Sequence, residues 1–272
     1  MGATVTVLNQ KGGVGKSTVV LGLASAARER GHKVLVVDLD PQAASSWVLG
    51  VDPERVRHSV HQVLSSGRRG AAREAIVGSE WGYLVDVVPS VGGLQSMESI
   101  KGGGLDQLLR GSKPTVRLRK ALEGVTDSYG LVLIDCPPSL GDLTTNGLAA
   151  ADQAIIVVEP AALSLRGVAP VADLIEDVWE RDNGELDLAG VIVNRMPARS
   201  RDAHDRYDEL SRTVGAESVW EPAIPYRVVL AEAAAAREPI HDMGSRGRDV
   251  AEVFDRLYDR LWSIIAPRSR RR

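Results

Sequence analysis

The feature that most constrains this chain is a glycine-rich segment near its N-terminus, between a short apolar run and a long helix-like run. The segment reads Asn9-Gln10-Lys11-Gly12-Gly13-Val14-Gly15-Lys16-Ser17-Thr18. Glycines let a backbone curl until successive N–H groups point at phosphate oxygens, and a following helix adds the positive end of its dipole. Lys16 can reach the β- and γ-phosphates of a nucleotide, and the Ser17 hydroxyl can ligate Mg²⁺. The segment predicts a phosphate-binding loop, although its spacing departs from the ordinary G-x-x-x-x-G-K-[ST] pattern and it carries an additional lysine, Lys11.

Short runs of Val, Ile and Leu alternate with amphipathic segments along the chain. Such near-continuous apolar runs are typical of strands covered on both faces, and strands that alternate with helices favour a parallel sheet. We expect strands at residues 4–8, 34–38, 84–88, 131–135, 154–158, 190–194 and 218–220. We expect helices at residues 16–30, 59–65, 115–123, 143–151, 164–181, 202–213 and 246–265. The pattern predicts one α/β domain over residues 1–272, with a doubly wound, mostly parallel sheet of about seven strands flanked by helices.

The composition excludes several classes of protein. The 272 residues are 44% hydrophobic and 25% charged, as is typical of a soluble globular protein. Cys136 is the single cysteine, so the chain holds no internal disulfide and no cysteine-ligated zinc or iron–sulfur site of its own. No apolar stretch is long enough to span a membrane, and the first residues do not resemble a secretory leader. We therefore expect a cytoplasmic protein.

Charge is distributed unevenly along the chain, although the net charge is only −3. Residues 195–272 carry more arginine than acidic residues, and four arginines lie in the basic tail at residues 268–272. This asymmetry favours a polyanionic partner for the C-terminal third. Arginine is preferred over lysine throughout the sequence, and a biased genome composition would explain that preference equally well.

Four motifs, in the same order, resemble those of the ParA/MinD family of deviant Walker A ATPases, in particular its ParA (Soj-like) partition branch. KGGVGKST at 11–18 resembles the deviant Walker A motif, and VLVVDLDPQ at 34–42 resembles the second strand and switch I. LIDCPP at 133–138 resembles the Walker B strand and switch II, and residues 224–233 resemble the stretch after the adenine pocket. The resemblance implies a P-loop NTPase fold, ATP or ADP with Mg²⁺ as cofactors, and hydrolysis of ATP to ADP and phosphate.

Four charged residues receive catalytic roles from their chemistry and from this resemblance together. Asp135 ends a buried apolar strand, where a carboxylate is costly unless it holds a cation, so we expect a Mg²⁺ shell of Ser17, Asp40 and Asp135. Asp40 would also position or activate the attacking water, and Asp38 would support the P-loop. The resemblance implies that Lys11 reaches across a nucleotide-sandwich dimer into the partner's site, as an arginine finger does. The predicted catalytic residues are Lys11, Lys16, Asp40 and Asp135.

The base of the nucleotide has predicted contacts in the second half of the chain. Asn194 ends a strand, and Pro225 and Arg227 occupy the later loop, where relatives hold the adenine ring. An asparagine at a strand end is also a common turn former, so Asn194 has a second explanation. The predicted nucleotide-binding residues are Lys11, Gly12, Gly13, Val14, Gly15, Lys16, Ser17, Thr18, Asn194, Pro225 and Arg227.

Members of the ParA branch bind DNA without sequence preference when ATP has dimerised them. Arg199 falls where some ParA relatives carry a DNA-contacting arginine. A second arginine, expected four residues after Pro225, is replaced by Val229, and Arg227 is the nearest substitute. Because each phosphate contact releases counterions, such binding should weaken steeply with salt. The candidate DNA-binding residues are Arg195, Arg199, Arg201, Arg227, Arg246 and Arg248.

These observations predict a nucleoid-associated ATPase of chromosome or plasmid partition. It would form a homodimer with ATP, bind nonspecific double-stranded DNA and be released on hydrolysis stimulated by a ParB-like centromere-binding protein. A MinD-like ATPase that binds membranes through its last helix is one alternative, since residues 254–265 contain an apolar stripe. Such a stripe is more typical of a helix packed on the sheet, so no membrane partner is expected. A ParA-like ATPase that positions a protein cargo is the other alternative.

Overall fold

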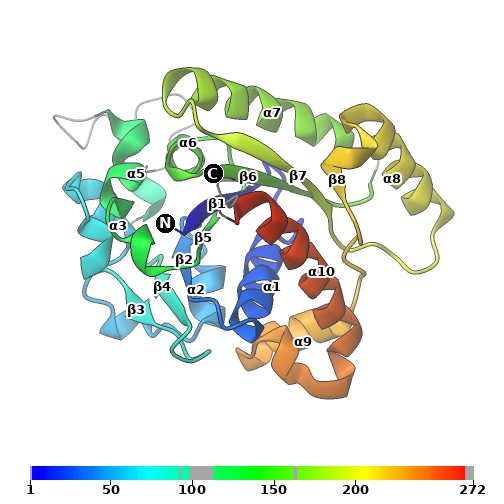
Figure 1. The fold of residues 1–272 in the computed structure, drawn as a ribbon, viewed down its shortest axis with the longest axis horizontal. Coiled ribbons are helices and arrows are strands. Elements are labelled where there is room, and N and C mark those ends of the chain that lie inside the picture. The colour runs from blue at the N-terminus through cyan, green and yellow to red at the C-terminus, as the bar shows by residue number, and fades with distance from the viewer. Residues whose placement is uncertain (1, 92–93, 98–112, 162–163, 267–272) are drawn as a thin grey trace, which may run out of the picture.

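The chain folds around one central sheet in the computed structural model, which describes residues 2–91, 94–97, 113–161 and 164–266. Within these ranges the sheet has eight strands in the order β3-β4-β2-β5-β1-β6-β7-β8 (Figure 1). The edge strand β3 is antiparallel to β4, and the other neighbouring strands are parallel. The predicted basic tail at 268–272 lies outside the described residues. The strands are β1 (Ala3–Leu8), β2 (Val34–Asp38), β3 (Val77–Gly78), β4 (Val85–Val88), β5 (Leu131–Asp135), β6 (Gln153–Val158), β7 (Asp187–Val193) and β8 (Val219–Trp220).

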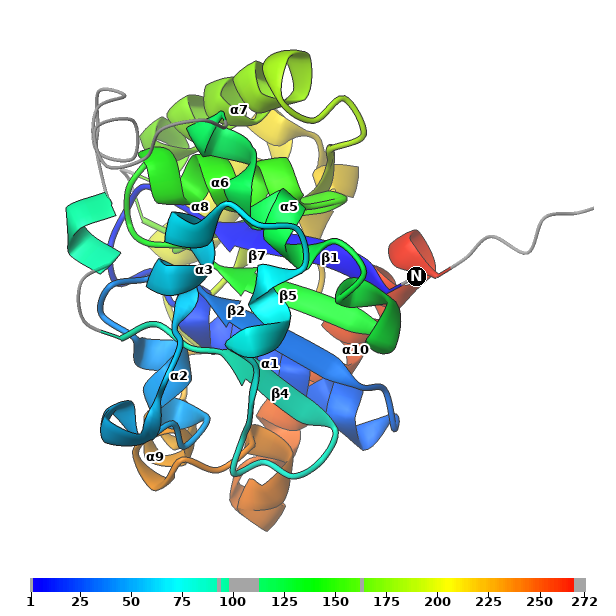
Figure 2. The same cartoon turned by 90° about the vertical axis from the view of Figure 1, so that its left-hand side faces the viewer.

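Helices cover both faces of the sheet (Figures 1 and 2). One face carries α3 (Val60–Ser66), α5 (Arg117–Leu122), α6 (Asp142–Ala150), α7 (Ser164–Arg181) and α8 (Arg201–Val214). The other face carries α1 (Lys16–Glu29), α2 (Ala44–Val48), α9 (Val228–Ala236), the 3₁₀ segment η7 (Ile240–Arg246) and α10 (Arg248–Ile265).

Each central strand contributes to the core on both of its sides. In β2, Leu35 and Val37 belong to the core under α3 and α5, while Val34 and Val36 belong to the core under α1 and α10. Successive side chains of a strand point to opposite faces, so a strand that is buried on both faces must be apolar at every position. This burial explains the continuous apolar runs in the sequence.

The chain winds outward from β1 in both directions. From β1 it passes to β2 and β4 on one side, returns to β5, and then continues through β6, β7 and β8 on the other side. In open α/β sheets, ligands bind outside the carboxyl ends of the strands at the point where the winding reverses. Here that point lies beside β1, and the predicted phosphate loop follows β1 directly.

The structure confirms the mostly parallel α/β sheet and adds elements that the periodicity did not predict. The strand β3 and the helix α2 are too short to leave a pattern in the sequence. The helix α9 is apolar at every position except Glu232, so it lacks the amphipathic period by which helices are recognised. The strand β7 begins at Asp187, earlier than the expected residue 190, because its first two residues are exposed and interrupt the apolar run.

The last helix, α10, is part of the core and packs against α1. The Phe254 ring lies against Gly22 of α1, and the Trp262 ring stacks on His32 with ring centroids 4.2 Å apart. Ile264, at the end of the helix, is 39% exposed. No helix within the described ranges is both long enough and apolar enough to cross a membrane. The fully buried members of the predicted apolar stripe are Phe254, Leu257, Tyr258 and Leu261.

Candidate functional site

The loop between β1 and α1 has a backbone that only glycine adopts easily. Gly13 and Gly15 have φ angles of 79° and 89°, in the left-handed region. Gly15 is also the N-cap of α1, whose first residue is Lys16. The N–H groups of a first helical turn have no partner within the helix, so this loop and the start of α1 together offer donors to an anion.

Asn194, directly after β7, packs on this loop from the other side. Its Nδ2 atom donates a hydrogen bond of 2.8 Å to the carbonyl oxygen of Val14. A Cβ atom at Gly15 would lie 2.1 Å from the same Nδ2 atom, so no other residue fits there without displacing Asn194. Its Oδ1 atom is buried and has no hydrogen-bond partner among the described residues. A buried acceptor of this kind requires a partner, and a ligand donor would supply one.

Asp135 is the last residue of β5 and lies in register with Asp38 of β2. Its Oδ2 atom accepts a hydrogen bond of 2.6 Å from the Ser45 hydroxyl, and its buried Oδ1 atom has no such partner in the described part of the chain. Burial raises the pKa of Asp135 to about 6; the Ser17 and Ser45 hydroxyls and the charge of Lys16 oppose this rise, and the charge of Asp40 adds to it. The Ser17 hydroxyl thus lies near the carboxylate. A buried, incompletely paired carboxylate is stabilised by a bound cation.

Asp38 is fully buried and organises the loop that follows β2. Its Oδ2 atom accepts hydrogen bonds from the backbone N–H and the hydroxyl of Ser46, at 2.8 and 2.7 Å, and its Oδ1 atom accepts one of 3.0 Å from the N–H of Asp40. The Ser46 hydroxyl in turn accepts a bond of 2.9 Å from the N–H of Ser90. Burial and the nearby charge of Asp135 raise the pKa of Asp38 to about 8. We expected Asp38 to support the P-loop, but its hydrogen bonds go to residues 40 and 46.

Lys16 and Asp40 complete the polar cluster beside Asp135. Lys16 is only 6% exposed, and burial lowers the pKa of its ammonium group, although the charges of Asp135 and Asp40 oppose this change. The Asp40 Oδ1 atom accepts a bond of 2.9 Å from the N–H of Gln42, which fixes the carboxylate at the start of the loop. One cation and two carboxylates therefore share a small buried volume at the edge of the sheet. Such a set can neutralise phosphate charge and orient a water molecule.

Lys11 lies on the rim of the loop and forms an ion pair with Glu159, the residue after β6. The Lys11 Nζ atom is 3.0 Å from Glu159 Oε2, and Arg195 Nη1 is 2.9 Å from Glu159 Oε1. Sequence analysis missed Glu159. A signal was present, because an acidic residue directly after a buried apolar strand is the same pattern that identified Asp135.

A cavity of about 250 Å³ opens beside Asn194, between the loop after β7 and the start of α9. The loop is fixed by two backbone hydrogen bonds, from Met196 N–H to Ile224 O at 2.8 Å and from Tyr226 N–H to Met196 O at 2.9 Å. The cavity brings together four predicted nucleotide-binding residues from separate parts of the chain. They are Thr18, Asn194, Pro225 and Arg227.

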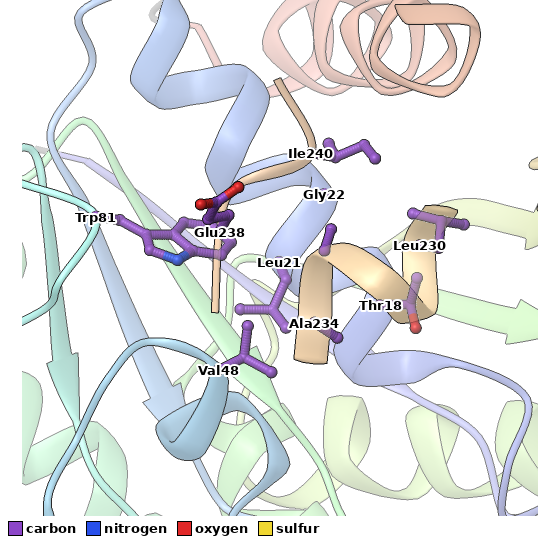
Figure 3. A pocket seen from close by; sticks show the side chains of 10 residues that line it. Thr18, Leu21, Gly22, Val48, Trp81, Leu230, Ala234, Glu238 and Ile240 are labelled. Carbon is purple, nitrogen blue, oxygen red and sulfur yellow. The ribbon is translucent and has the colours of Figure 1, made fainter. Parts of the chain in front are cut away.

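A second, apolar cavity lies between α1, α2 and α9 (Figure 3). Its volume is about 40 Å³, far below that of a nucleotide. It is lined by Leu21 of α1, Val48 of α2 and Trp81 of the turn between β3 and β4, and of the predicted site only Thr18 reaches it. This cavity is therefore separate from the polar cluster around Asp135.

The six candidate DNA-binding arginines fall into two groups. Arg195, Arg227 and Arg246 form ion pairs with acidic residues at 2.9 Å, with Glu159, Asp249 and Glu232 respectively. The other three are exposed and have no ion pair with any described residue; they are Arg199, Arg201 and Arg248. Val229, which stands where an arginine was expected, is 8% exposed and belongs to the core under α1. An arginine at that position of α9 would not reach solvent freely.

The strand ends thus assemble a site that fits a nucleoside triphosphate with a divalent cation. The loop after β1 supplies N–H donors and Lys16, while β5 supplies a buried carboxylate oxygen without a hydrogen-bond partner among the described residues. The side-chain amide of Asn194 supplies a second buried oxygen without a hydrogen-bond partner in the described ranges, and it lies at a cavity large enough for a base. The chemistry of these donors matches hard cations and phosphates rather than a metal held by sulfur or imidazole.

Comparison with known proteins agrees with this geometry. Residues 2–188 match the AAA domain family. The chromosome partitioning protein ParA of Myxococcus xanthus is 31% identical over 274 residues, which cover 100% of this chain and 92% of that protein. The sporulation initiation inhibitor protein Soj of Bacillus subtilis is 32% identical over 252 residues, which cover 92% and 95% of the two chains.

A solved structure is similar over the same length. The crystal structure of cobyrinic acid a,c-diamide synthase from Mycobacterium smegmatis with bound ADP and magnesium has a TM-score of 0.76 and 31% identity, and the match covers 97% of this chain and 96% of that one. The family match extends over more than half of the chain, and the named relatives exceed 30% identity over nearly all of it. The chain therefore belongs to the ParA/MinD family of AAA-domain P-loop ATPases.

Proposed function

We propose that this protein is a partition ATPase that dimerises with ATP and Mg²⁺, binds DNA without sequence preference and leaves the DNA after hydrolysis stimulated by a ParB-like partner. The observation that carries the proposal is the position of Asp135, whose buried Oδ1 atom has no hydrogen-bond partner in the described ranges and lies beside Lys16. The similarity to ParA and Soj over nearly the whole chain supports partition as the purpose of the ATPase. Such a protein would act in the cytoplasm, on the nucleoid.

The residues that would hold the cofactors follow from the site. The loop amides and Lys16 would hold the triphosphate, Asn194 with Pro225 would hold the base, and Ser17, Asp40 and Asp135 would surround the cation. Bound Mg²⁺ would neutralise phosphate charge during hydrolysis. The Asp40 carboxylate, fixed by the N–H of Gln42, would orient the attacking water.

Two surface features support the proposed steps that follow ATP binding, namely dimerisation and DNA binding. The Lys11 side chain is 44% exposed on the rim of the loop, so it is accessible to a second subunit that faces this edge of the sheet. Arg199, Arg201 and Arg248 are exposed and free of ion pairs within the described residues, so their charges are available to DNA phosphates. The DNA-contacting set that we propose is therefore led by these three arginines rather than by all six candidates.

Hydrolysis and DNA binding can be tested on the full chain. Phosphate release from Mg·ATP should occur in the wild type and be lost in Lys16→Ala, and random-sequence DNA should shift in a gel only with ATP and less at high salt. If calorimetry with Mg²⁺ detects no binding of ATP or ADP to the wild type, the proposal is wrong at its first step. If ATP is hydrolysed and no DNA shift occurs, the DNA-binding step of the proposal is wrong, and the ATPase serves another purpose such as positioning a protein cargo.

Experiments on the same full chain distinguish two other functions from the proposed one. A MinD-like membrane function would need a free apolar face on α10, yet that face is buried against α1, so we expect no co-sedimentation of the full chain with anionic liposomes. The similarity to a structure named as a diamide synthase raises ATP-dependent amide formation as a second candidate. ATP turnover that requires a carboxylic acid and an amine donor, and ignores DNA, would favour that activity.

A further inference from the structure

Glu159 joins two cations at the edge of the phosphate loop. Its two carboxylate oxygens are used separately, one at 3.0 Å from Lys11 Nζ and the other at 2.9 Å from Arg195 Nη1. The Glu159 side chain is 19% exposed, whereas those of Lys11 and Arg195 are 44% and 49% exposed. The acidic centre of the cluster is therefore better shielded than either cation. We call these three residues the Glu159 cluster.

Glu159 is negatively charged in this arrangement. Burial alone would raise the pKa of its carboxyl group, but the hydrogen bonds and charges of Lys11 and Arg195 outweigh burial and lower it. At neutral pH the cluster thus contains one negative and two positive charges. Either cation can leave while the carboxylate stays paired with the other.

The backbone of Lys11 is fixed independently of its side chain. Asn9 Oδ1 accepts a hydrogen bond of 2.8 Å from the N–H of Lys11, and Asn9 Nδ2 donates one of 2.6 Å to the carbonyl oxygen of Val157 in β6. The Lys11 ammonium can therefore exchange partners without a change in the loop that precedes Gly12.

We propose that Glu159 is a positioning residue that holds Lys11 within its own subunit until a phosphate of the partner's nucleotide takes its place. This inference rests on the proposed function, in which Lys11 acts across an ATP-bound dimer. Formation of that dimer exchanges the Lys11–Glu159 contact for a lysine–phosphate contact, and Arg195 remains as the counter-ion of Glu159. Glu159 thereby sets the protein concentration at which ATP can join two subunits.

The size of the effect follows from the exposure of the pair. A half-exposed ion pair alters an equilibrium by roughly two- to fivefold. In a dimer with two-fold symmetry both copies of Lys11 must leave their own Glu159, so the two factors multiply. Removal of the Glu159 charge should then tighten the ATP-dependent dimer by roughly 4- to 25-fold.

The test is Glu159→Gln in the full chain, because glutamine keeps the size of the side chain and removes its charge. The dimer Kd is measured by sedimentation with Mg²⁺ and a slowly hydrolysed ATP analogue, and ATP turnover is measured as a function of protein concentration. We expect the predicted fall in Kd and an earlier rise of turnover with concentration, with the same turnover per dimer at saturation. A purely structural role for Glu159 would lower the melting temperature and leave the nucleotide-dependent Kd unchanged.

Two further variants make the result specific. Glu74→Gln removes a carboxylate from the exposed Arg68–Glu74 pair, whose atoms are 2.7 Å apart and which lies away from the loop, so its dimer Kd should equal that of the wild type. In a Lys11→Gln background, Glu159→Gln should no longer tighten the dimer, since no ammonium group remains to be released.

The outcomes separate this inference from the function on which it rests. If the wild type dimerises with ATP and Glu159→Gln has an equal or weaker dimer affinity, or a lower turnover at saturation, the holding role of Glu159 is wrong and the partition ATPase stands. If the wild type binds no ATP, or binds it and stays monomeric at all concentrations, the proposed dimer and this inference fall together.

Discussion

The aromatic ring of Phe254 in α10 lies directly against Gly22 in α1. A Cβ atom at Gly22 would be 2.1, 2.3 and 2.4 Å from three carbon atoms of that ring. Phe254 is fully buried, so its ring has no solvent-filled space into which it could move. The missing side chain at position 22 thus allows the last helix to approach the helix that begins at the phosphate loop.

We expect Gly22→Ala to destabilise the protein, although alanine is the better helix former. Alanine gains about 1 kcal/mol in helix propensity, whereas an extra carbon in a filled core costs about 1–3 kcal/mol. Urea titration should show a net loss of up to roughly 2 kcal/mol in the free energy of unfolding, the packing cost less the gain in helix propensity. Gly167→Ala in α7 is the control, because its Cβ would meet its nearest atom at 3.8 Å; it should be neutral or stabilising. Equal stability of the two variants would contradict the close packing of α10 on α1.

We expect Gly15→Ala to lose ATP affinity while the protein remains folded. The position has φ of 89°, and a Cβ there would strike the Asn194 amide that holds the loop. Calorimetry should show an ATP affinity at least about tenfold weaker, equivalent to about 1.4 kcal/mol. Gly31→Ala is a matched control, since φ is 73° there and nothing lies within 4 Å of the added carbon. It should share the backbone strain and bind ATP as the wild type does.

The division of the arginines predicts a difference in the salt dependence of DNA binding. Arg199→Ala and Arg201→Ala should each reduce the slope of log affinity against log salt by about 0.9 per subunit of the dimer, the value for one phosphate contact. Arg246→Ala should change the slope less, because Arg246 is already paired with Glu232 at 2.9 Å. Titrations of fluorescent random-sequence DNA at several salt concentrations measure all three slopes. An equal or larger change in Arg246→Ala would show that its ion pair opens on DNA.

The ion pairs of Glu159 should stabilise the free protein in a pH-dependent way. Lys11 and Arg195 lower the pKa of Glu159 below its ordinary value of 4.5, although burial opposes them. The stabilisation is therefore complete above that value and is lost as the pH falls through the lower pKa of the folded state. In urea titrations, the difference between wild type and Glu159→Gln should be constant from pH 6 to pH 8 and shrink below about pH 4.5. A difference that grows in acid would contradict the lowered pKa.

The features that could be predicted from the sequence are those formed by residues adjacent in the chain. The order of strand, glycine loop and helix at Lys16 and the acidic end of β5 at Asp135 each occupy a few adjacent residues, so their patterns are visible in one dimension. The contact between Lys11 and Glu159 joins residues 148 positions apart, and it depends on β6 being the neighbour of β1 in the sheet. No local pattern contains that information.

The sequence also does not show which partner a charged side chain finds in the fold. The pattern Asp38-Leu39-Asp40 indicates two carboxylates at a strand end, and only the fold shows that the first is used by Ser46 while the second faces Lys16. The candidate arginines illustrate the same limit, because their acidic partners come from the residue after β6, from α10 and from α9. Helix α9 remained undetected because a segment made mainly of alanine and valine has no polar face to define a period.

The central place of β1 in the sheet has a consequence for how the chain acquires its fold. Ala3 pairs with Leu131 of β5 and Val5 pairs with Gln153 of β6, so β1 is synthesised 128 and 148 residues ahead of these two partners. Pairings between such distant segments carry a large loop-closure entropy and slow the formation of a sheet. The glycine loop therefore depends on distant segments, because a nascent chain that ends before residue 131 lacks both strands that flank β1 and the Asn194 amide that bonds the loop.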